Sequence, residues 1–433
     1  MIPKINLVKL LESPVILENL AKLYGHDDLI LKQQAQRYLK LARPHKKFFS
    51  AEPVAFFSSP GRTEIGGNHT DHNHGKVLAA SVNLDTIAAV NLSNDNKITI
   101  FSEGYSAPFV VDIRHTRAKT EERGTTSALI RGIVARFKEF SFNTGGFNAT
   151  LTSNVLVGSG LSSSASVEVL VGTILNHLFN DARIKPEEIA KIGQYAENNY
   201  FGKPCGLMDQ MAIAVGGIIA IDFKDPLNPV IRKVKSDFSQ LDYSLLVVDT
   251  GGSHVNLTAD YAAIPREMQA VAKSLGGQTC RDITYKKLIR NIASLRQKVG
   301  DRPILRAMHF LAENERVEKM VLALEGGMFD IFLNLINESG ASSARWLQNN
   351  FSTKNPNEQG VGLALALTEI FIKNSGKPGA CRVHGGGFAG TIQVFIANEL
   401  LPDYIKLIES VFSRGSVTQL AIRTVGATCL NRL

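Results

Sequence analysis

The chain has 433 residues, and 48 lysines and arginines against 40 aspartates and glutamates give it a formal net charge of +8. Hydrophobic residues make up 44% and charged residues 20%, a globular composition that excludes a disordered chain, a collagen-like fibre and a coiled-coil rod. No apolar run approaches the ~20 residues that a membrane helix needs, and the first residues lack the continuous apolar stretch of a signal peptide. We therefore predict a cytoplasmic protein without a membrane partner.

The cysteines and the basic residues point to no special chemistry. Cys205, Cys280, Cys381 and Cys429 are widely spaced and form no CxxC pair, which predicts buried or semi-buried free thiols instead of disulfides or a zinc site. The positive charge is diffuse along the chain, so we expect no nucleic-acid partner. A positive surface also suits a protein that handles phosphorylated small molecules.

The first half of the chain alternates helical and strand patterns. Helical periodicity predicts that the first ~50 residues are helical, and a break is expected at 59–61. The elements expected after the break are strands over 77–92, 97–101 and 146–156, helices over 125–140, 167–179 and from Pro186, and a strand over 218–223.

The second half repeats this mixture without a regular βαβ rhythm. The expected strands are 244–250, 391–397 and 416–425, and the expected helices are 259–275, 302–325 and 359–374. This order predicts an α+β fold with mixed or antiparallel sheets and not a doubly wound parallel sheet.

A Gly/Ser-rich turn at 157–166 separates a strand from an apolar helix. Its glycines allow a sharp turn, the helix start offers unpaired N–H donors, and the serine hydroxyls add donors that would also suit a magnesium ion. The residues of this predicted phosphate cradle are Gly158, Ser159, Gly160, Leu161, Ser162, Ser163, Ser164 and Ala165. A plain loop capped by serine would have the same composition.

A polar segment at 60–75 places six polar side chains between glycines, a density that suits a polyhydroxylated ligand. His69, His72 and His74 with Asp71 would also suit a divalent metal, and a solvated loop is the third alternative.

Two acidic residues complete the candidate set. Asp209 is the one acid in the stretch 205–210 and would serve as a general base, although a helix cap explains it equally well. Glu197 lies at the edge of the apolar stripe of the helix that begins at Pro186, where an inward-facing magnesium ligand would lie. A surface acid is the simpler reading of Glu197 taken alone.

Four motifs in this order resemble those of the GHMP kinases, and specifically the galactokinases. They are Gly61-Arg62 with His69-Thr70-Asp71 and Asn73, the GLSSSA segment 160–165, the CGLMDQ segment 205–210, and the GGGFAG segment 385–390. The resemblance spans roughly residues 55–400. It implies a two-lobed α+β fold with a cleft that holds ATP and a sugar.

The resemblance also implies a role for each matching residue. Asp209 would be the base for the anomeric hydroxyl, and Arg62 would stabilise the transferring phosphoryl group. Ser164 and Glu197 would hold Mg²⁺. The residues implied to bind the sugar are Asn68, His69, Asp71, Gly206 and Tyr261. The implied reaction is ATP-dependent phosphorylation at C1 of a hexose, with D-galactose as the first choice.

The chain departs from the family motif at three positions. Asn68 replaces the usual Glu, His72 the usual Tyr, and Glu64 the usual Asn. In the family the Glu before the His contacts the C6 hydroxyl, so Asn68 would remove a negative charge that repels a C6 carboxylate. A C6-modified sugar such as galacturonate is therefore an alternative substrate.

The domain organisation is expected to follow the lobes. We predict a helical extension over 1–50, an N-terminal kinase lobe over 51–215 and a C-terminal kinase lobe over 216–433, in a monomer or weak homodimer. A non-catalytic sugar and ATP sensor is the alternative from another functional class, although Arg62, Ser164, Glu197 and Asp209 are all present.

Overall fold

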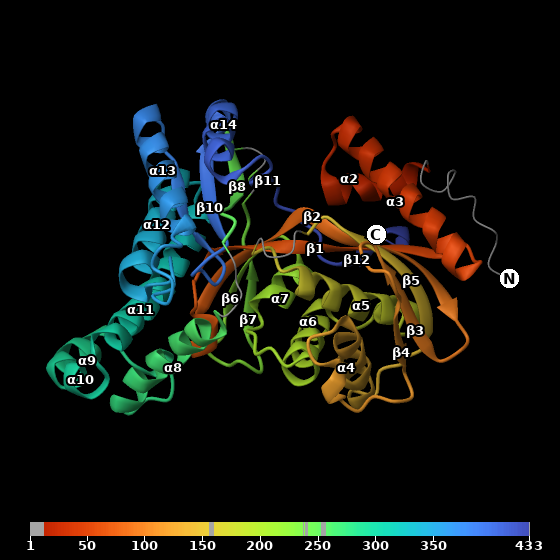
Figure 1. Cartoon of the computed structure of the whole chain (residues 1–433), viewed down its shortest axis with the longest axis horizontal. Helices are drawn as coiled ribbons and strands as arrows, with labels where there is room; N and C mark the ends of the chain where they lie inside the picture. Colours follow the sequence, from red (N-terminus) through yellow and green to blue (C-terminus); the bar gives the residue numbers. More distant parts are fainter. Residues whose placement is uncertain (1–12, 156–159, 237, 239–240, 253–256, 433) are drawn as a thin grey trace.

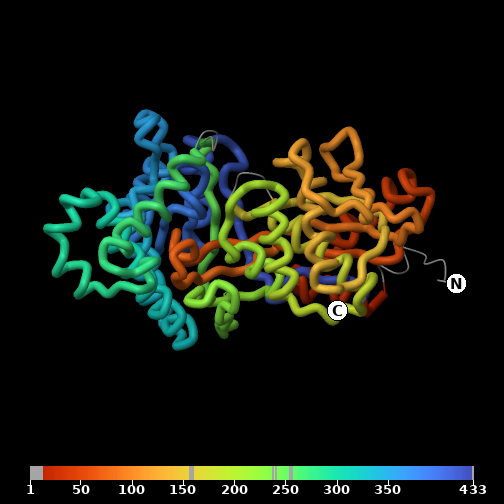
Figure 2. The backbone as a smooth tube through the Cα atoms, turned by 90° about the horizontal axis from the view of Figure 1, so that it is seen from below, coloured from red at the N-terminus to blue at the C-terminus, as the bar shows by residue number. Residues whose placement is uncertain are grey.

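The computed structural model describes residues 13–432 except for 156–159, 237, 239–240 and 253–256. Two β-sheets with flanking helices organise this part of the chain (Figure 1). Figure 2 shows the C-terminus returning to the end of the molecule that holds the N-terminal helices. The structure therefore has the predicted α+β class.

The first sheet has eight strands within the described residues, in the order β12-β1-β2-β5-β3-β4, with β6 paired to β2 and β7 to β6. Its strands are β1 (Ala55–Gly66), β2 (Lys76–Ser93), β3 (Lys97–Ser102), β4 (Phe109–Asp112), β5 (Gly146–Ser153), β6 (Ile218–Asp222), β7 (Val230–Lys233) and β12 (Thr428–Cys429). β3 and β5 run parallel, and the other described pairs of this sheet are antiparallel.

The break expected at 59–61 is wrong, because β1 continues through these residues. The register of β1 against β2 shifts between Pro60 and Arg62 and again between Glu64 and Gly66. A proline has no N–H to donate to a ladder, and an irregularity of this kind accommodates it. The same irregular strand carries Arg62 into the candidate site.

Both faces of the first sheet are covered. Phe57 and Ala88 pack with the helices on one face, whereas Phe56, Ile87 and Ala89 pack with the N-terminal helices on the other. Figure 1 shows α2 and α3 on one side of the sheet and α4 to α7 on the opposite side. These helices are α2 (Pro14–Tyr24), α3 (Asp28–Phe49), α4 (Thr126–Glu139), α5 (Ser163–Phe179), α6 (Pro186–Ala196) and α7 (Met208–Val215).

The second sheet is antiparallel in the order β11-β8-β10-β9. Its strands are β8 (Tyr243–Asp249), β9 (Ala380–His384), β10 (Thr391–Ala397) and β11 (Val417–Leu420). The accompanying helices are α8 (Thr258–Ser274), α9 (Tyr285–Arg290), α10 (Ile292–Val299), α11 (Asp301–Glu325), α12 (Phe329–Ser342), α13 (Gly360–Ser375) and α14 (Leu401–Phe412). The sequence patterns predicted α8, α11 and α13 but missed α9, α10, α12 and α14.

The two lobes share one hydrophobic core at their junction. Ile65 and Leu78 of the first sheet pack in the same cluster as Val317 and Met320 of α11. The predicted division at residue 216 does not coincide with a change of sheet. β6, β7 and β12 all follow that residue and pair within the first sheet. The chain therefore crosses between the lobes more than once.

None of the four cysteines forms a disulfide; Cys280, Cys381 and Cys429 are buried and Cys205 is partly exposed, as predicted. In the described part of the chain, no helix combines the length and apolar character that crossing a membrane requires.

Candidate active site

An arginine–aspartate pair forms the centre of the candidate site. Arg62 Nε donates to Asp209 Oδ1 at 2.7 Å and Arg62 Nη2 donates to Oδ2 at 2.6 Å, a bidentate pair between β1 and the first turn of α7. The Arg62 side chain is 7% exposed and that of Asp209 is 30% exposed. The carboxylate is therefore fixed by the protein and still reachable from outside.

The environment of Asp209 keeps its carboxyl ionised. Burial raises the pKa of Asp209, but the Arg62 charge and the hydrogen bonds from Arg62 and Ser162 outweigh burial, so the pKa lies below its usual value. Among the described residues, Oδ1 accepts one hydrogen bond, from Arg62, while Oδ2 accepts from both Arg62 and Ser162. Counting lone pairs, Oδ1 has one left to accept a further proton.

The described part of the predicted phosphate loop converges on the same pair. Arg62 Nη1 donates to Gly160 O, and the backbone N–H of Arg62 donates to Leu161 O at 3.0 Å. Gly160 has a φ of +71° and a Cβ there would lie 2.8 Å from His384 Nδ1, so glycine is needed at this position. Gly158 and Ser159 lie outside the described residues.

The serines of the loop have different positions and contacts. Ser162 precedes α5 in a left-handed conformation, and its hydroxyl donates to Asp209 instead of capping the helix. Ser163 and Ser164 begin α5 and are partly exposed, whereas Ala165 and Leu161 are buried in the core. The first turn of α5 therefore presents N–H groups and hydroxyls beside Asp209, the arrangement that binds phosphate.

A tight turn after β1 carries the predicted sugar residues. His69 has a φ of 56°, and Gly67 has a φ of +90° with no room for a Cβ, which would lie 2.4 Å from Lys76 O. Thr70 Oγ1 donates to Gly67 O at 2.9 Å and to Lys76 O at 2.6 Å, which closes the turn. The chain thus passes from β1 into the short helix η1 (Asp71–Asn73).

His69 and Tyr261 meet at the glycine-rich segment 385–390. His69 Nε2 donates to Gly386 O at 2.9 Å, and burial with the nearby His72 lowers the pKa of His69 to about 3, so this ring is neutral. Tyr261 Oη donates to Gly387 O at 3.0 Å, and burial raises the pKa of Tyr261 to about 12. The structure therefore brings together residues that are separated by more than 300 positions.

Asp71 and Gly206 form a second close approach. A Cβ at Gly206 would lie 1.8 Å from Asp71 Oδ2, so only glycine allows this carboxylate to reach the loop before α7. The Asp71 side chain is 12% exposed. Asp209 follows Gly206 by three residues. This contact therefore links the turn that carries His69 and Asp71 to the Asp209 carboxylate of the central pair.

The contacts of Asn68 differ from those expected of a residue that binds the sugar directly. It is fully buried, and Nδ2 donates both protons, to Glu64 Oε1 at 2.8 Å and to Gly385 O at 2.7 Å. Oδ1 accepts from Asn349 Nδ2 at 2.8 Å. The amide has no free N–H for a sugar, which favours an indirect role.

The two motif departures at positions 64 and 68 contact each other. The Glu64 carboxylate accepts from Asn68 and pairs with Arg382 at 2.7 Å, with both side chains of this ion pair buried. Burial raises the pKa of Glu64 despite the opposing effect of Arg382. A carboxyl group therefore remains next to Asn68, so the asparagine does not remove acidity from this region.

Glu197 lies just past the end of α6, in the π-helical turn η3 (Glu197–Phe201), and is 3% exposed. Its Oε2 accepts from Gln210 Nε2 at 3.0 Å, and Lys203 Nζ lies 3.8 Å from Oε1. Within the described residues, no group of three or more His, Cys, Asp or Glu is arranged to hold a metal ion.

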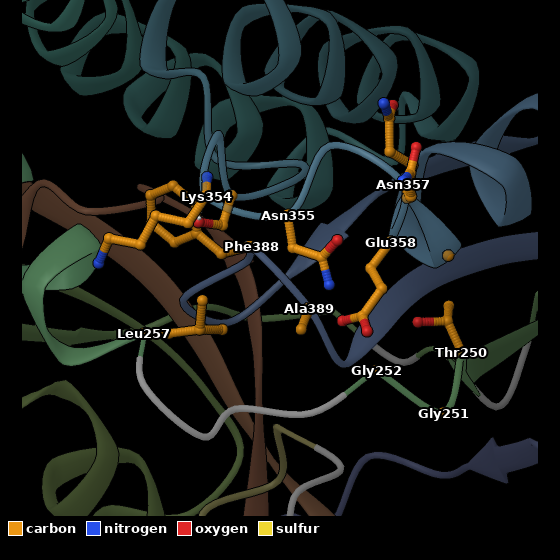
Figure 3. A pocket seen from close by; sticks show the side chains of 13 residues that line it. Thr250, Gly251, Gly252, Leu257, Lys354, Asn355, Asn357, Glu358, Phe388 and Ala389 are labelled. Carbon is orange, nitrogen blue, oxygen red and sulfur yellow. Dashed lines mark hydrogen bonds between the residues drawn. The ribbon is translucent and has the colours of Figure 1, made fainter.

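A cavity of about 810 Å³ borders the site through Phe388, whose ring packs edge-on against Tyr261. Figure 3 shows its wall of polar side chains from the segment 352–360, including Lys354, Asn355 and Glu358. Neither Arg62 nor Asp209 lines it. The cavity lies beside the centre that the motifs predicted.

Several buried polar residues of the site carried no sequence signal. Glu168 and Asn349 contact Gln210 and Asn68 respectively, and His384 lies against Gly160 of the predicted phosphate loop. The pairing of β9 with β10 fixes the position of His384, and Asn349 lies in the segment after α12. Only the tertiary fold brings these two residues to the site. Gln210 is the exception, because it stands next to Asp209 in the CGLMDQ segment.

Comparison with known proteins agrees with this geometry. Residues 128–217 match the model of the GHMP kinases N terminal domain, and residues 43–92 match the galactokinase galactose-binding signature. A galactokinase of Streptomyces coelicolor is 30% identical over 378 residues, covering 86% of this chain and 92% of the relative. A galactokinase of Lactococcus lactis is 28% identical, covering 84% and 88%.

Solved structures agree with these relatives. Lactococcus lactis galactokinase complexed with galactose superposes with a TM-score of 0.76 at 25% identity, covering 90% of this chain and 99% of that chain. Methanococcus jannaschii mevalonate kinase superposes with a TM-score of 0.58 at 14% identity, covering 85% and 98%, which shows the fold alone. The protein therefore has the GHMP kinase fold. Within that class, the chain belongs to the galactokinase family.

Proposed function

We propose that this protein phosphorylates D-galactose at the C1 hydroxyl, using ATP, by direct in-line transfer of the γ-phosphoryl group. Membership of the galactokinase family supports the activity. The observation that carries the mechanism is the bidentate Arg62–Asp209 pair beside the first turn of α5. This places a fixed carboxylate next to a phosphate-binding helix start.

Asp209 acts as the base for the sugar hydroxyl. Its lowered pKa keeps it ionised at neutral pH, and Oδ1 retains a lone pair for the C1 proton. As the oxygen–phosphorus bond forms, the hydroxyl proton passes to Asp209 and the bond to the ADP oxygen breaks. Phosphoryl transfer needs positioning and charge neutralisation more than covalent catalysis, and the site provides both.

Arg62 and the start of α5 neutralise the phosphoryl oxygens. Arg62 is held by Asp209 and Gly160 O, so its charge is fixed where the phosphate loop meets the sugar turn. The N–H groups at the start of α5, with Ser163 and Ser164, bind the phosphates of ATP. Gly158 and Ser159, which the sequence also predicts to bind ATP, lie outside the described residues.

The residues present suit a magnesium ion that arrives with ATP. Mg²⁺ is usually bound by one or two carboxylates together with substrate phosphates and water. The Ser164 hydroxyl and the Glu197 carboxylate supply an oxygen donor set of this kind. A bound Mg²⁺ would draw negative charge from the β- and γ-phosphate oxygens.

Four residues bind and orient the sugar: His69, Asp71, Gly206 and Tyr261. Asn68 holds in place the turn that carries His69 and Asp71. Galactose is favoured over galacturonate because the Glu64 carboxyl group remains beside Asn68. The two departures exchange the acidic residue and the asparagine between positions 64 and 68. An acidic group therefore remains in this region, and the exchange does not create a site for a C6 carboxylate.

The test is ADP release with Mg-ATP and a panel of galactose, galacturonate, N-acetylgalactosamine, glucose and arabinose. Turnover of galactose well above the other sugars supports the proposal. A preference for galacturonate would transfer the function to a C6-modified sugar. No turnover of any sugar, with ATP still bound, would favour the sensor.

A further inference from the structure

One helix of the C-terminal lobe contacts the turn that carries predicted sugar residues. This turn, residues 67–76, connects β1 to β2 in the first sheet, whereas α11 accompanies the second sheet. Near the end of β1, Ile65 lies in the same hydrophobic cluster as Val317 and Met320 of α11. A Cβ at Gly66 would lie 2.6 Å from Met320 Sδ, so the helix and the strand are in close contact. Figure 1 shows α11 beside this end of β1.

The first and the last residue of the turn bond to two adjacent residues of α11. The backbone N–H of Gly67 donates to Glu313 Oε1 at 3.0 Å. The backbone N–H of Lys76 donates to Asn314 Oδ1 at 2.7 Å. Because both acceptors belong to one turn of one helix, these two bonds fix the distance that the turn has to span.

A third bond fixes a carbonyl inside the turn. His309 Nε2 donates to Asn68 O at 2.9 Å, and His309 Nδ1 accepts from Ser342 Oγ of α12 at 2.8 Å. Burial lowers the pKa of His309, so the ring is neutral and its single proton lies on the nitrogen that faces the carbonyl. Asn68 directly precedes His69, which has the left-handed φ of 56°. The helix therefore also holds the backbone at the entry to this conformation.

Glu313 is itself held in one position. Its side chain is fully buried, Oε1 also accepts from Ser339 Oγ at 2.6 Å, and Oε2 accepts from Arg316 Nη1. Both carboxylate oxygens are thus paired, and Gly67 N–H meets a fixed acceptor. Removing one partner of a buried ion pair is strongly destabilising, so a variant of Glu313 would report on folding as much as on the turn.

We propose that α11 positions the turn 67–76 for sugar binding, and that Asn314 is a positioning residue that acts through the backbone of Lys76. The inference rests on the proposed function, because His69 and Asp71 of this turn would bind galactose. A site that is already ordered before binding loses less freedom when the ligand arrives. The lobe that does not carry the turn therefore contributes to the affinity for the sugar.

The first test replaces Asn314, whose side chain is partly exposed and tolerates substitution better than the buried Glu313. Asn314→Ala removes the acceptor of Lys76 N–H and should raise the galactose KM about 3- to 10-fold, the equivalent of one lost hydrogen bond. The ATP KM and kcat should change little, because α11 holds the sugar side of the site. Asn314→Asp keeps an oxygen at this position and should restore the galactose KM.

Asn337→Ala is the matched control. Asn337 of α12 also accepts from a backbone N–H, that of Cys381, at 3.1 Å, and donates to Gly379 O at 3.0 Å. It therefore has the same chemistry as Asn314 but holds β9 instead of the turn, and its loss should leave the galactose KM unchanged. Equal rises of this KM in the two alanine variants would overturn the proposal. An unchanged KM in a folded Asn314→Ala would also overturn it.

The second test detects the contact without a ligand. Hydrogen–deuterium exchange of peptides that span residues 67–76 should be faster in Asn314→Ala than in wild type and unchanged in Asn337→Ala. Exchange at the wild-type rate in Asn314→Ala would overturn the proposal. Neither sugar nor ATP is needed. A wild-type protein that does not turn over galactose would refute the proposed function, while the exchange result would still decide whether α11 holds the turn.

Discussion

Two arginine–carboxylate pairs stand on β1 two residues apart, and they differ in exposure. Arg62 pairs with Asp209, whose side chain is 30% exposed, whereas Glu64 pairs with Arg382, and these two side chains are 5% and 0% exposed. The first pair joins the strand to α7 and faces the site. The second joins the strand to β9 in the interior. Burial thus separates the pair that we propose does the chemistry from a pair that joins the two sheets.

The contrast extends to protonation. The pKa of Asp209 lies below its usual value because Arg62 and Ser162 outweigh burial. The pKa of Glu64 lies above its usual value because burial outweighs Arg382 and Asn68. The same ion-pair chemistry therefore gives an ionised carboxylate at Asp209 and a carboxyl group with reduced acidity at Glu64.

The largest expected effect is on Asp209. Asp209→Asn keeps the shape of the side chain but removes its charge, so kcat should fall about 10²- to 10⁴-fold, as for loss of a general base. ATP binding should be retained, measured by titration calorimetry. A kcat within tenfold of wild type would show that the exposed pair is not the catalytic one.

Breaking the buried pair should instead affect folding. Glu64→Gln leaves Arg382 without its carboxylate, which should lower the free energy of unfolding by about 3–5 kcal/mol in urea titrations. Glu399→Gln is the matched control, because the Lys377–Glu399 pair is exposed and solvent screening should leave the free energy of unfolding almost unchanged. Equal losses in the two variants would remove the distinction between the pairs.

Arg62→Lys should have an intermediate effect. Lysine keeps the positive charge but loses the bidentate geometry, at a cost of about 1.5–3 kcal/mol, or about 10- to 150-fold in kcat/KM. The galactose KM should change less than kcat, since we propose that Arg62 contacts the transferring phosphoryl group and not the sugar. Steady-state kinetics against galactose and ATP will separate the two, and a loss confined to KM would contradict this assignment.

The smallest expected effect is on pH dependence. Because the pKa of Asp209 is lowered in the folded protein, the stabilisation from its pair is fully present above the unfolded pKa of about 3.9 and is lost as the pH falls through the folded value. The kcat/KM of wild type should therefore not decline between pH 8 and about pH 5 through Asp209. In Arg62→Met the acid limb should move to higher pH, and an unmoved limb would exclude Arg62 as its cause.

Local patterns predicted much of the fold and the centre of the site. Helical and strand periodicity found α4, β5 and α8, and the motifs found Arg62, Asp209 and the start of α5. Glu197 was predicted from its place at the edge of the apolar stripe of the helix that begins at Pro186. Residues whose role depends on burial were not predictable in this way. The motif position of Asn68 predicts that it binds the sugar. Its actual contacts include Asn349, which lies in a distant segment of the chain. The sequence pattern treats Glu168 as an ordinary helical residue, and only the packing of α5 against α6 and α7 shows that it is buried.

The central claim is that the partly buried Arg62–Asp209 pair directs phosphoryl transfer to C1 of galactose. The most direct measurement is the ³¹P NMR spectrum after wild type and Asp209→Asn are each incubated with Mg-ATP and galactose. The account predicts a sugar 1-phosphate resonance with wild type that is nearly absent with Asp209→Asn. No sugar phosphate with wild type, or equal amounts with both proteins, would contradict it.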